Sequence, residues 1–252
     1  QQYNIRIVNM SICDDEPVSY KQSEVDQLTE KLIEEGIVVV AAVGNDESGS
    51  IKPPANALHV IAVGGIDDDN KLGEPAHRLY HSSFGKTVDE LMKPELVAHA
   101  IWIAAPILPN SEEQQESELL HQLLELPDNH LFNGLQKING HTGKDNSIQS
   151  TDAAVIKESI QLRIQACKYI SPHYMHVDGT SFAAPIVSSI IAQLLEINAA
   201  LTPAMIRTIL FSTAKRLKNW PAERQGFGMV QAKKAILDRK STRLNSSHRT
   251  GS

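Results

Sequence analysis

The segment 179–185, Gly-Thr-Ser-Phe-Ala-Ala-Pro, places a serine at the start of a predicted buried helix. Gly179 permits a tight turn into the helix, Thr180 can cap its end, and Pro185 is expected in the first turn, where its missing N–H is tolerated. A helix N-terminus directs free N–H groups and a partial positive charge toward the Ser181 hydroxyl. The segment therefore suits Ser181 to act as a nucleophile whose oxyanion is stabilised.

This segment resembles the active-site motif Gly-Thr-Ser-x-Ala-x-Pro of the subtilisin-like serine peptidases, the subtilases, at every fixed position. A second segment, Ala42 to Asn45, resembles the family's Ala-x-Gly-Asn, which follows a buried strand. By that resemblance Ser181 is the catalytic nucleophile, and the Asn45 side chain and the Ser181 N–H form the oxyanion hole. The alternatives are a buried helix that happens to begin with Gly-Thr-Ser and an ordinary strand-end turn.

The resemblance extends to the segment 7–11, Ile-Val-Asn-Met-Ser. It is similar to the subtilase strand that pairs with extended substrate and helps to line the S1 pocket. The resemblance implies substrate-binding roles for Ser11, Ile12, Cys13 and Gly44. Ile12 and Cys13 stand where the family has Leu and Gly, so the side chain of Cys13 could narrow the pocket and alter specificity.

Two parts of the family's catalytic apparatus have no counterpart in the sequence. Subtilases use Asp, His and Ser in that chain order, with the Asp in an Asp-Ser/Thr-Gly string and the His in a His-Gly-Thr-His string. Neither string occurs here, and the chain opens at Gln1 without an initiator Met or a signal-peptide pattern. We therefore expect the C-terminal part of a subtilase domain, and we expect this chain alone to be inactive.

The order of predicted elements indicates an α/β fold. A strand at 6–10, a helix at 23–35 with Gly36 as its C-terminal cap, and a strand from Ile37 follow in close succession. This pattern predicts βαβ units, a mostly parallel sheet and helices on both faces. The expected architecture is the three-layer subtilisin-like fold, incomplete at its N-terminus.

Residues 1–238 are expected to form one partial peptidase domain. Its segment 106–173 is longer than in compact subtilases and is interpreted as an insertion, either a surface elaboration or a lid or substrate-recognition element near the S1 side. Amphipathic patterns predict helices at 111–126 and 153–169 within it, with a loop at 133–150. Residues 239–252 match nothing in the family and are interpreted as a disordered or non-native tail.

Composition narrows the classes of function. Of the 252 residues, 41% are hydrophobic and 21% charged, as in an ordinary globular domain, and the net charge of −6 argues against nucleic-acid binding. No apolar run was expected to be long enough to span a membrane. Cys13 and Cys167 indicate neither a disulfide framework nor a metal site. The resemblance implies no organic cofactor, although structural calcium with unassigned ligands is common in the family.

The sequence therefore predicts a serine endopeptidase that acts on peptide or protein substrates. The first alternative is a pseudopeptidase that binds peptides without cleaving them. A second is an unrelated ester hydrolase, which would require a Gly-x-Ser-x-Gly elbow that the sequence lacks. The family resemblance favours secretion, but intracellular subtilases exist, so the compartment stays open.

Overall fold

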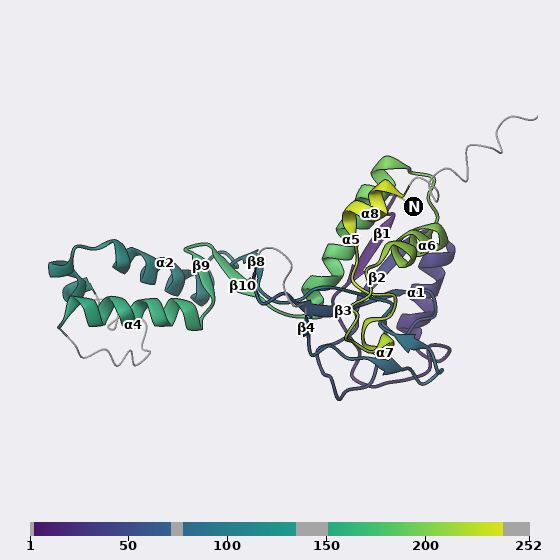
Figure 1. Cartoon of the computed structure of the whole chain (residues 1–252), viewed down its shortest axis with the longest axis horizontal. Helices are drawn as coiled ribbons and strands as arrows, with labels where there is room; N and C mark the ends of the chain where they lie inside the picture. The colour runs from purple at the N-terminus through teal and green to yellow at the C-terminus, as the bar shows by residue number, and fades with distance from the viewer. Residues whose placement is uncertain (1–2, 72–77, 135–150, 239–252) are drawn as a thin grey trace, which may run out of the picture. The chain divides into compact units, whose positions relative to one another are not determined.

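The computed structural model describes residues 3–71, 78–134 and 151–238, and the chain divides into two compact units (Figure 1). The first unit takes the described residues up to Trp102 and those from Asp178 onward. The second unit is Ile103–Val177. The predicted loop lies outside the described residues over 135–150, and so does the predicted tail at 239–252.

The first unit is built on a mostly parallel sheet, as expected. β1 (Ile7–Met10) pairs in parallel with β2 (Val38–Ala42), and β2 pairs in parallel with β3 (Ile61–Asp67). β7 (Leu96–His99) also lies parallel to β3, whereas β4 (Arg78–Leu79) is antiparallel to it. All five residues of β2 are buried, which agrees with a strand covered on both faces.

Helices cover both faces of this sheet and give three layers (Figure 1). α5 (Thr180–Ile197) packs with α6 (Pro203–Thr213) and α8 (Ala232–Leu237) against Val38, Val40 and their neighbours on one face. On the other face α1 (Glu24–Glu34) packs against the alternate residues of β2. Because successive side chains of a strand point to opposite faces, β2 contributes side chains to the apolar cores on both faces of the sheet.

α1 begins and ends where the sequence predicts, and its buried side chains include polar ones. Ser23 is the N-cap and accepts a hydrogen bond from the Asp26 N–H, and Gly36 follows the C-cap with a φ of 86°. Among its apolar residues, Leu32 and Ile33 pack against the core, whereas Val25 and Leu28 are exposed. Asp26 and Thr29 are fully buried instead.

The start of α5 differs from the expectation in two respects. Gly179 is the N-cap and Thr180 is the first helical residue, so the prediction that Thr180 caps the helix is wrong. Pro185 lies in the second turn rather than in the first, and its missing N–H therefore removes an intrahelical hydrogen bond. Both differences bear on the site described below.

α5 also corrects the expectation about membrane-spanning length. Within the described part of the chain, its 18 residues are the one helix long and apolar enough to cross a bilayer by length and composition. In the structure this helix packs on the sheet, with Ala183, Ala184, Val187 and Ile191 completely buried.

The second unit has its own sheet and core. β8 (Ile103–Pro106) pairs antiparallel with β10 (Tyr174–Val177), which pairs antiparallel with β9 (Tyr169–Ser171). The two predicted helices are present as α2 (Glu112–Glu125) and α4 (Ala153–Ala166). Their buried faces share one apolar core, formed by Ile107, Leu120, Leu123, Leu131, Ile156, Ile160 and Tyr169. The identity of 106–173 as a family insertion stays a prediction.

The remaining elements of the first unit are short. β5 (Gly85–Lys86) and β6 (Met92–Lys93) form a two-stranded antiparallel ribbon, and α7 is Ala222–Gln225. Met229 bridges to Val97 in β7, so the C-terminal part of the described chain extends the sheet locally.

Candidate active site

The ends of β1 and β2 and the beginning of α5 lie together in the first unit. Asn45 follows β2, and its Oδ1 accepts hydrogen bonds from the Thr180 N–H at 2.8 Å and from Thr180 Oγ1 at 2.9 Å. An N–H can donate only to the amide oxygen, so the bond from the Thr180 N–H identifies which side-chain atom of Asn45 is Oδ1 and which is Nδ2. The amide nitrogen Nδ2 is then the end left to donate to another group, and no described residue accepts from it.

Thr180 is a site residue whose role the sequence reading missed. Its side chain is completely buried, and Oγ1 accepts a hydrogen bond from the Gly44 N–H at 3.3 Å while it donates to Asn45 Oδ1. The hydroxyl is therefore committed to the strand end and cannot cap its own helix. A Thr between a glycine and the serine at this helix start is the sequence signal that could have indicated the contact.

Two glycines make this close approach of loop and helix possible. Gly44 has a φ of 110°, and a Cβ there would lie 2.7 Å from Ser83 Oγ. Gly179 has a φ of 131°, and a Cβ there would lie 3.4 Å from Asn45 Nδ2. Both backbone conformations are favourable only for glycine. Contact of Gly44 with substrate stays a prediction.

Ser181 is half-buried in the first turn of α5. Its N–H belongs to the group of first-turn donors that have no partner within a helix, so it can bind an external oxygen. Among the described residues, no side chain forms a hydrogen bond with the Ser181 hydroxyl. Asn45 Nδ2 and the Ser181 nitrogen both lie near Gly179, at 3.4 Å and 3.7 Å from a Cβ built at that residue, and their role as oxyanion donors stays a prediction.

The predicted substrate strand reaches the same place. Ser11 follows β1, and its Oγ donates to the carbonyl oxygen of Ser181 at 2.9 Å. The next two residues, Ile12 and Cys13, are exposed, and the Cys13 thiol is free. Ile12 is 66% exposed, so its side chain is available for a ligand. Substrate contact by Ser11, Ile12 and Cys13 stays a prediction.

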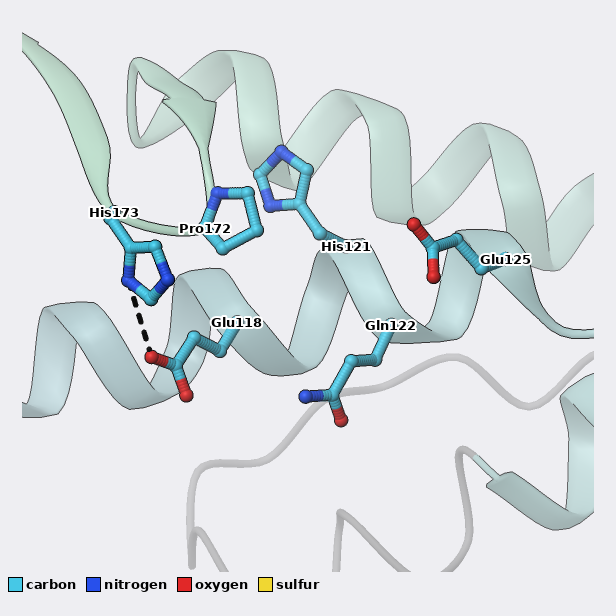
Figure 2. A pocket seen from close by; sticks show the side chains of 6 residues that line it. All are labelled: Glu118, His121, Gln122, Glu125, Pro172 and His173. Carbon is cyan, nitrogen blue, oxygen red and sulfur yellow. Dashed lines mark ion pairs between the residues drawn. The ribbon is translucent and has the colours of Figure 1, made fainter.

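The second unit contains a separate shallow pocket of about 370 Å³. Figure 2 shows it between α2 and the β9–β10 turn, with the Glu118 side chain directed toward His173. The distance from Glu118 Oε1 to His173 Nδ1 is 3.4 Å. The residues that line this pocket are Glu118, His121, Gln122, Glu125, Pro172 and His173. Over residues 3–71, 78–134 and 151–238 no group of three or more His, Cys, Asp or Glu is arranged to hold a metal ion.

Comparisons with known proteins agree with the arrangement in the first unit. The family model described as the subtilase family, peptidase S8, matches residues 1–228. The chain is 25% identical over 239 residues to the serine protease AprX of Bacillus subtilis (strain 168), covering 92% of this chain and 43% of AprX. The chain thus spans less than half the length of that relative.

Two solved structures share the fold. The prenylagaramide maturation protease PagA aligns with a TM-score of 0.56 and 18% identity, over 93% of this chain and 62% of PagA. Fervidolysin from Fervidobacterium pennivorans, a keratinolytic enzyme related to subtilisin, aligns with a TM-score of 0.55 and 20% identity, over 93% of this chain and 27% of fervidolysin. These likenesses support the subtilisin-like α/β architecture expected from the sequence.

Proposed function

The chain belongs to the subtilase family, and from that premise we propose that it carries the nucleophile and the oxyanion hole of a serine endopeptidase. The observation that supports this most directly is the pair of hydrogen bonds between Asn45 Oδ1 and Thr180. They orient the Asn45 amide as a donor beside the first turn of the helix that carries Ser181. An ordinary strand-end turn would not require this bond.

The chemistry follows from the positions of these groups. Ser181 Oγ attacks the carbonyl carbon of a peptide bond, and the carbonyl oxygen becomes an oxyanion. Asn45 Nδ2 and the Ser181 N–H donate to that oxygen, whose negative charge develops in the transition state that leads to the tetrahedral intermediate. The general base that takes the proton of Ser181 gives it to the departing amine, and water then hydrolyses the resulting ester of Ser181. No cofactor is required for these steps, and the structural calcium expected from the family stays a proposal without assigned ligands.

Ser181 needs a general base to lose its proton. The family supplies it as a His oriented by an Asp, and neither motif occurs in the 252 residues. We therefore propose that both lie in a polypeptide segment outside this sequence, and that the chain by itself has no peptidase activity. Secretion of the protein, favoured by the family resemblance, is likewise a proposal.

A peptide-binding protein without catalysis is the second candidate. It would use the exposed residues after β1, Ile12 and Cys13, to hold an extended peptide. It differs from the peptidase in one respect, which is the absence of the Asp and His motifs from the whole gene product.

The test compares this chain with a longer product of the same gene that contains the Asp and His motifs. A fluorophosphonate probe should label Ser181 rapidly in the longer protein and slowly, if at all, in this chain. Ser181→Ala in the longer protein is the matched control and should abolish labelling and cleavage of a peptide ester. Rapid labelling of this chain alone would contradict the proposal, and a gene product without the two motifs would favour the binding protein.

A further inference from the structure

The carbonyl group of Ser181 lacks the donor that a helix normally provides. In an α-helix the C=O of residue i accepts a hydrogen bond from the N–H of residue i+4. For Ser181 that residue is Pro185, which has no N–H. Ser181, the proposed nucleophile, thus lacks the i+4 hydrogen bond to its carbonyl oxygen within α5.

Ser11 supplies a donor from outside the helix. Its Oγ lies 2.9 Å from the Ser181 carbonyl oxygen, although the two residues are 170 positions apart in the sequence. A hydroxyl has one proton, and here the proton points toward the carbonyl because Asn9 Nδ2 donates to the same Oγ at 3.0 Å. Asn9 therefore fixes the direction in which Ser11 donates.

Asn9 is itself held by α5. Its Oδ1 accepts a hydrogen bond from Ser188 Oγ at 3.0 Å, two turns after Ser181 on the same helix. The three hydrogen bonds form a chain that leaves α5 at Ser188, passes through Asn9 and Ser11 at the end of β1, and returns to α5 at Ser181. The end of β1 thus bridges the part of the helix that Pro185 interrupts.

We infer that Ser11 is a positioning residue for Ser181, and that its hydroxyl replaces the N–H that Pro185 lacks. The bond holds the peptide plane that follows Ser181, and hence the backbone from which the nucleophile projects. This role differs from direct substrate binding by Ser11. The effect of Ser11 on catalysis rests on the proposed function. The hydrogen bond between Ser11 and Ser181 does not, because both residues belong to this chain.

The inference predicts that the effect of Ser11 depends on residue 185. Ser11→Ala leaves the Ser181 carbonyl without either donor. In a Pro185→Ala background the helix can supply its own N–H at position 185, so the loss of the Ser11 hydroxyl should matter little. Pro185 is exposed, so this substitution creates no cavity in the core. Ser11→Thr keeps a hydroxyl and is the conservative control.

Amide hydrogen exchange on this chain tests the structural step without any need for activity. Loss of one net hydrogen bond should speed exchange of the amides between Phe182 and Val187 by about 2- to 10-fold in Ser11→Ala. Ser11→Thr should resemble the parent, and Ser11→Ala with Pro185→Ala should resemble Pro185→Ala alone. Equal acceleration by Ser11→Ala in both backgrounds would overturn the inference, and thermal unfolding of each variant verifies that it is folded.

Kinetics in the longer protein test the catalytic consequence. Ser11→Ala should lower kcat and leave KM nearly unchanged, and Pro185→Ala should restore most of the loss. A raised KM with unchanged kcat would make Ser11 a substrate-binding residue and would overturn the positioning role. If the exchange data show the dependence on residue 185 but no variant cleaves peptide, the positioning inference stands and the proposed peptidase function fails.

Discussion

Asn45 and Thr180, which are 135 positions apart, are joined by two hydrogen bonds to the same side-chain oxygen, at 2.8 and 2.9 Å. The contact ties the end of β2 to the start of α5. Both hydrogen bonds use the Asn45 side-chain oxygen, so the amide N–H₂ group is the part of this side chain that is left to donate to another molecule. The hydrogen bonds that hold the loop in place therefore also orient the donor that the proposed reaction requires.

Replacing Asn45 by Ala should reduce catalysis without weakening substrate binding. The lost interaction forms mainly in the transition state, so kcat should fall and KM should move little. In subtilisin itself, loss of the oxyanion-hole Asn lowers kcat by about 10²–10³-fold, and we take over that measured value as the expectation. Steady-state kinetics of the longer protein on one peptide substrate provide the measurement. A higher KM at constant kcat would make Asn45 a turn or binding residue.

Replacing Thr180 by Val should destabilise the first unit although the two side chains have nearly the same shape. The Gly44 N–H and Asn45 Oδ1 would each lose a bond to the hydroxyl, which is expected to cost about 1–3 kcal/mol in the free energy of unfolding. Chemical denaturation of this chain measures the change.

Thr29→Val is the matched control for that substitution. Thr29 is also completely buried, but its hydroxyl donates to the Val25 carbonyl, which as part of α1 can keep its helical N–H partner. The control should therefore cost less than Thr180→Val. Equal losses would show that the hydroxyl of Thr180 has no special role.

Gly44→Ala should be more harmful than the same change at Gly36. Both glycines have positive φ, at 110° and 86°, so both substitutions strain the backbone by about 1–3 kcal/mol. Only at Gly44 would the new Cβ meet an atom at 2.7 Å, which is Ser83 Oγ, whereas Gly36 has no atom within 4 Å. Thermal unfolding should show the larger loss for Gly44→Ala. In a Ser83→Ala background, which already lacks the bond from the Ser83 hydroxyl to the Asp46 carbonyl, Gly44→Ala should cost no more than Gly36→Ala does. If the two single variants lose the same stability, the contact with Ser83 is unimportant.

The stability of the first unit should fall as pH rises through the range from about 4 to 6. Burial raises the pKa of the Asp26 carboxyl from 3.8 to about 6, and both carboxyl oxygens lack a hydrogen-bond partner among the described residues. Between these pH values the folded state binds more protons than the unfolded state does, so the free energy of unfolding decreases with pH, by up to about 3 kcal/mol in total.

Asp26→Asn tests this dependence, because the amide is uncharged at every pH in the range. The variant should be more stable than the parent at neutral pH, and its unfolding free energy should change less between pH 4 and 7. Glu24→Gln, at an exposed position of the same helix, is the control and should leave the parent's pH profile unchanged. A parent whose stability rises over this range would contradict the raised pKa.

The sequence by itself determined the local elements and the candidate residues. Sequence patterns predicted a strand from Ile37, which is β2, and helices that correspond to α1, α2 and α4. The motif around Ser181 predicted the start of α5. Local patterns suffice for these predictions because each depends on neighbours in the chain. The burial of Asp26 in α1 had no signal in these local patterns, because the packing of the helix in the folded unit decides which of its side chains are covered.

The tertiary structure alone decided how these pieces form a site. Thr180 was expected to cap its own helix, yet its hydroxyl binds Gly44 and Asn45. Substrate contact by Ser11 stays a prediction, whereas the bond from its hydroxyl to the Ser181 carbonyl, across 170 positions, had no signal in the sequence. A hydroxyl can satisfy its hydrogen bonds with any polar group in reach, and only the packing of β1 and β2 against α5 determines which groups those are. That long-range choice leaves no periodic signal in the sequence.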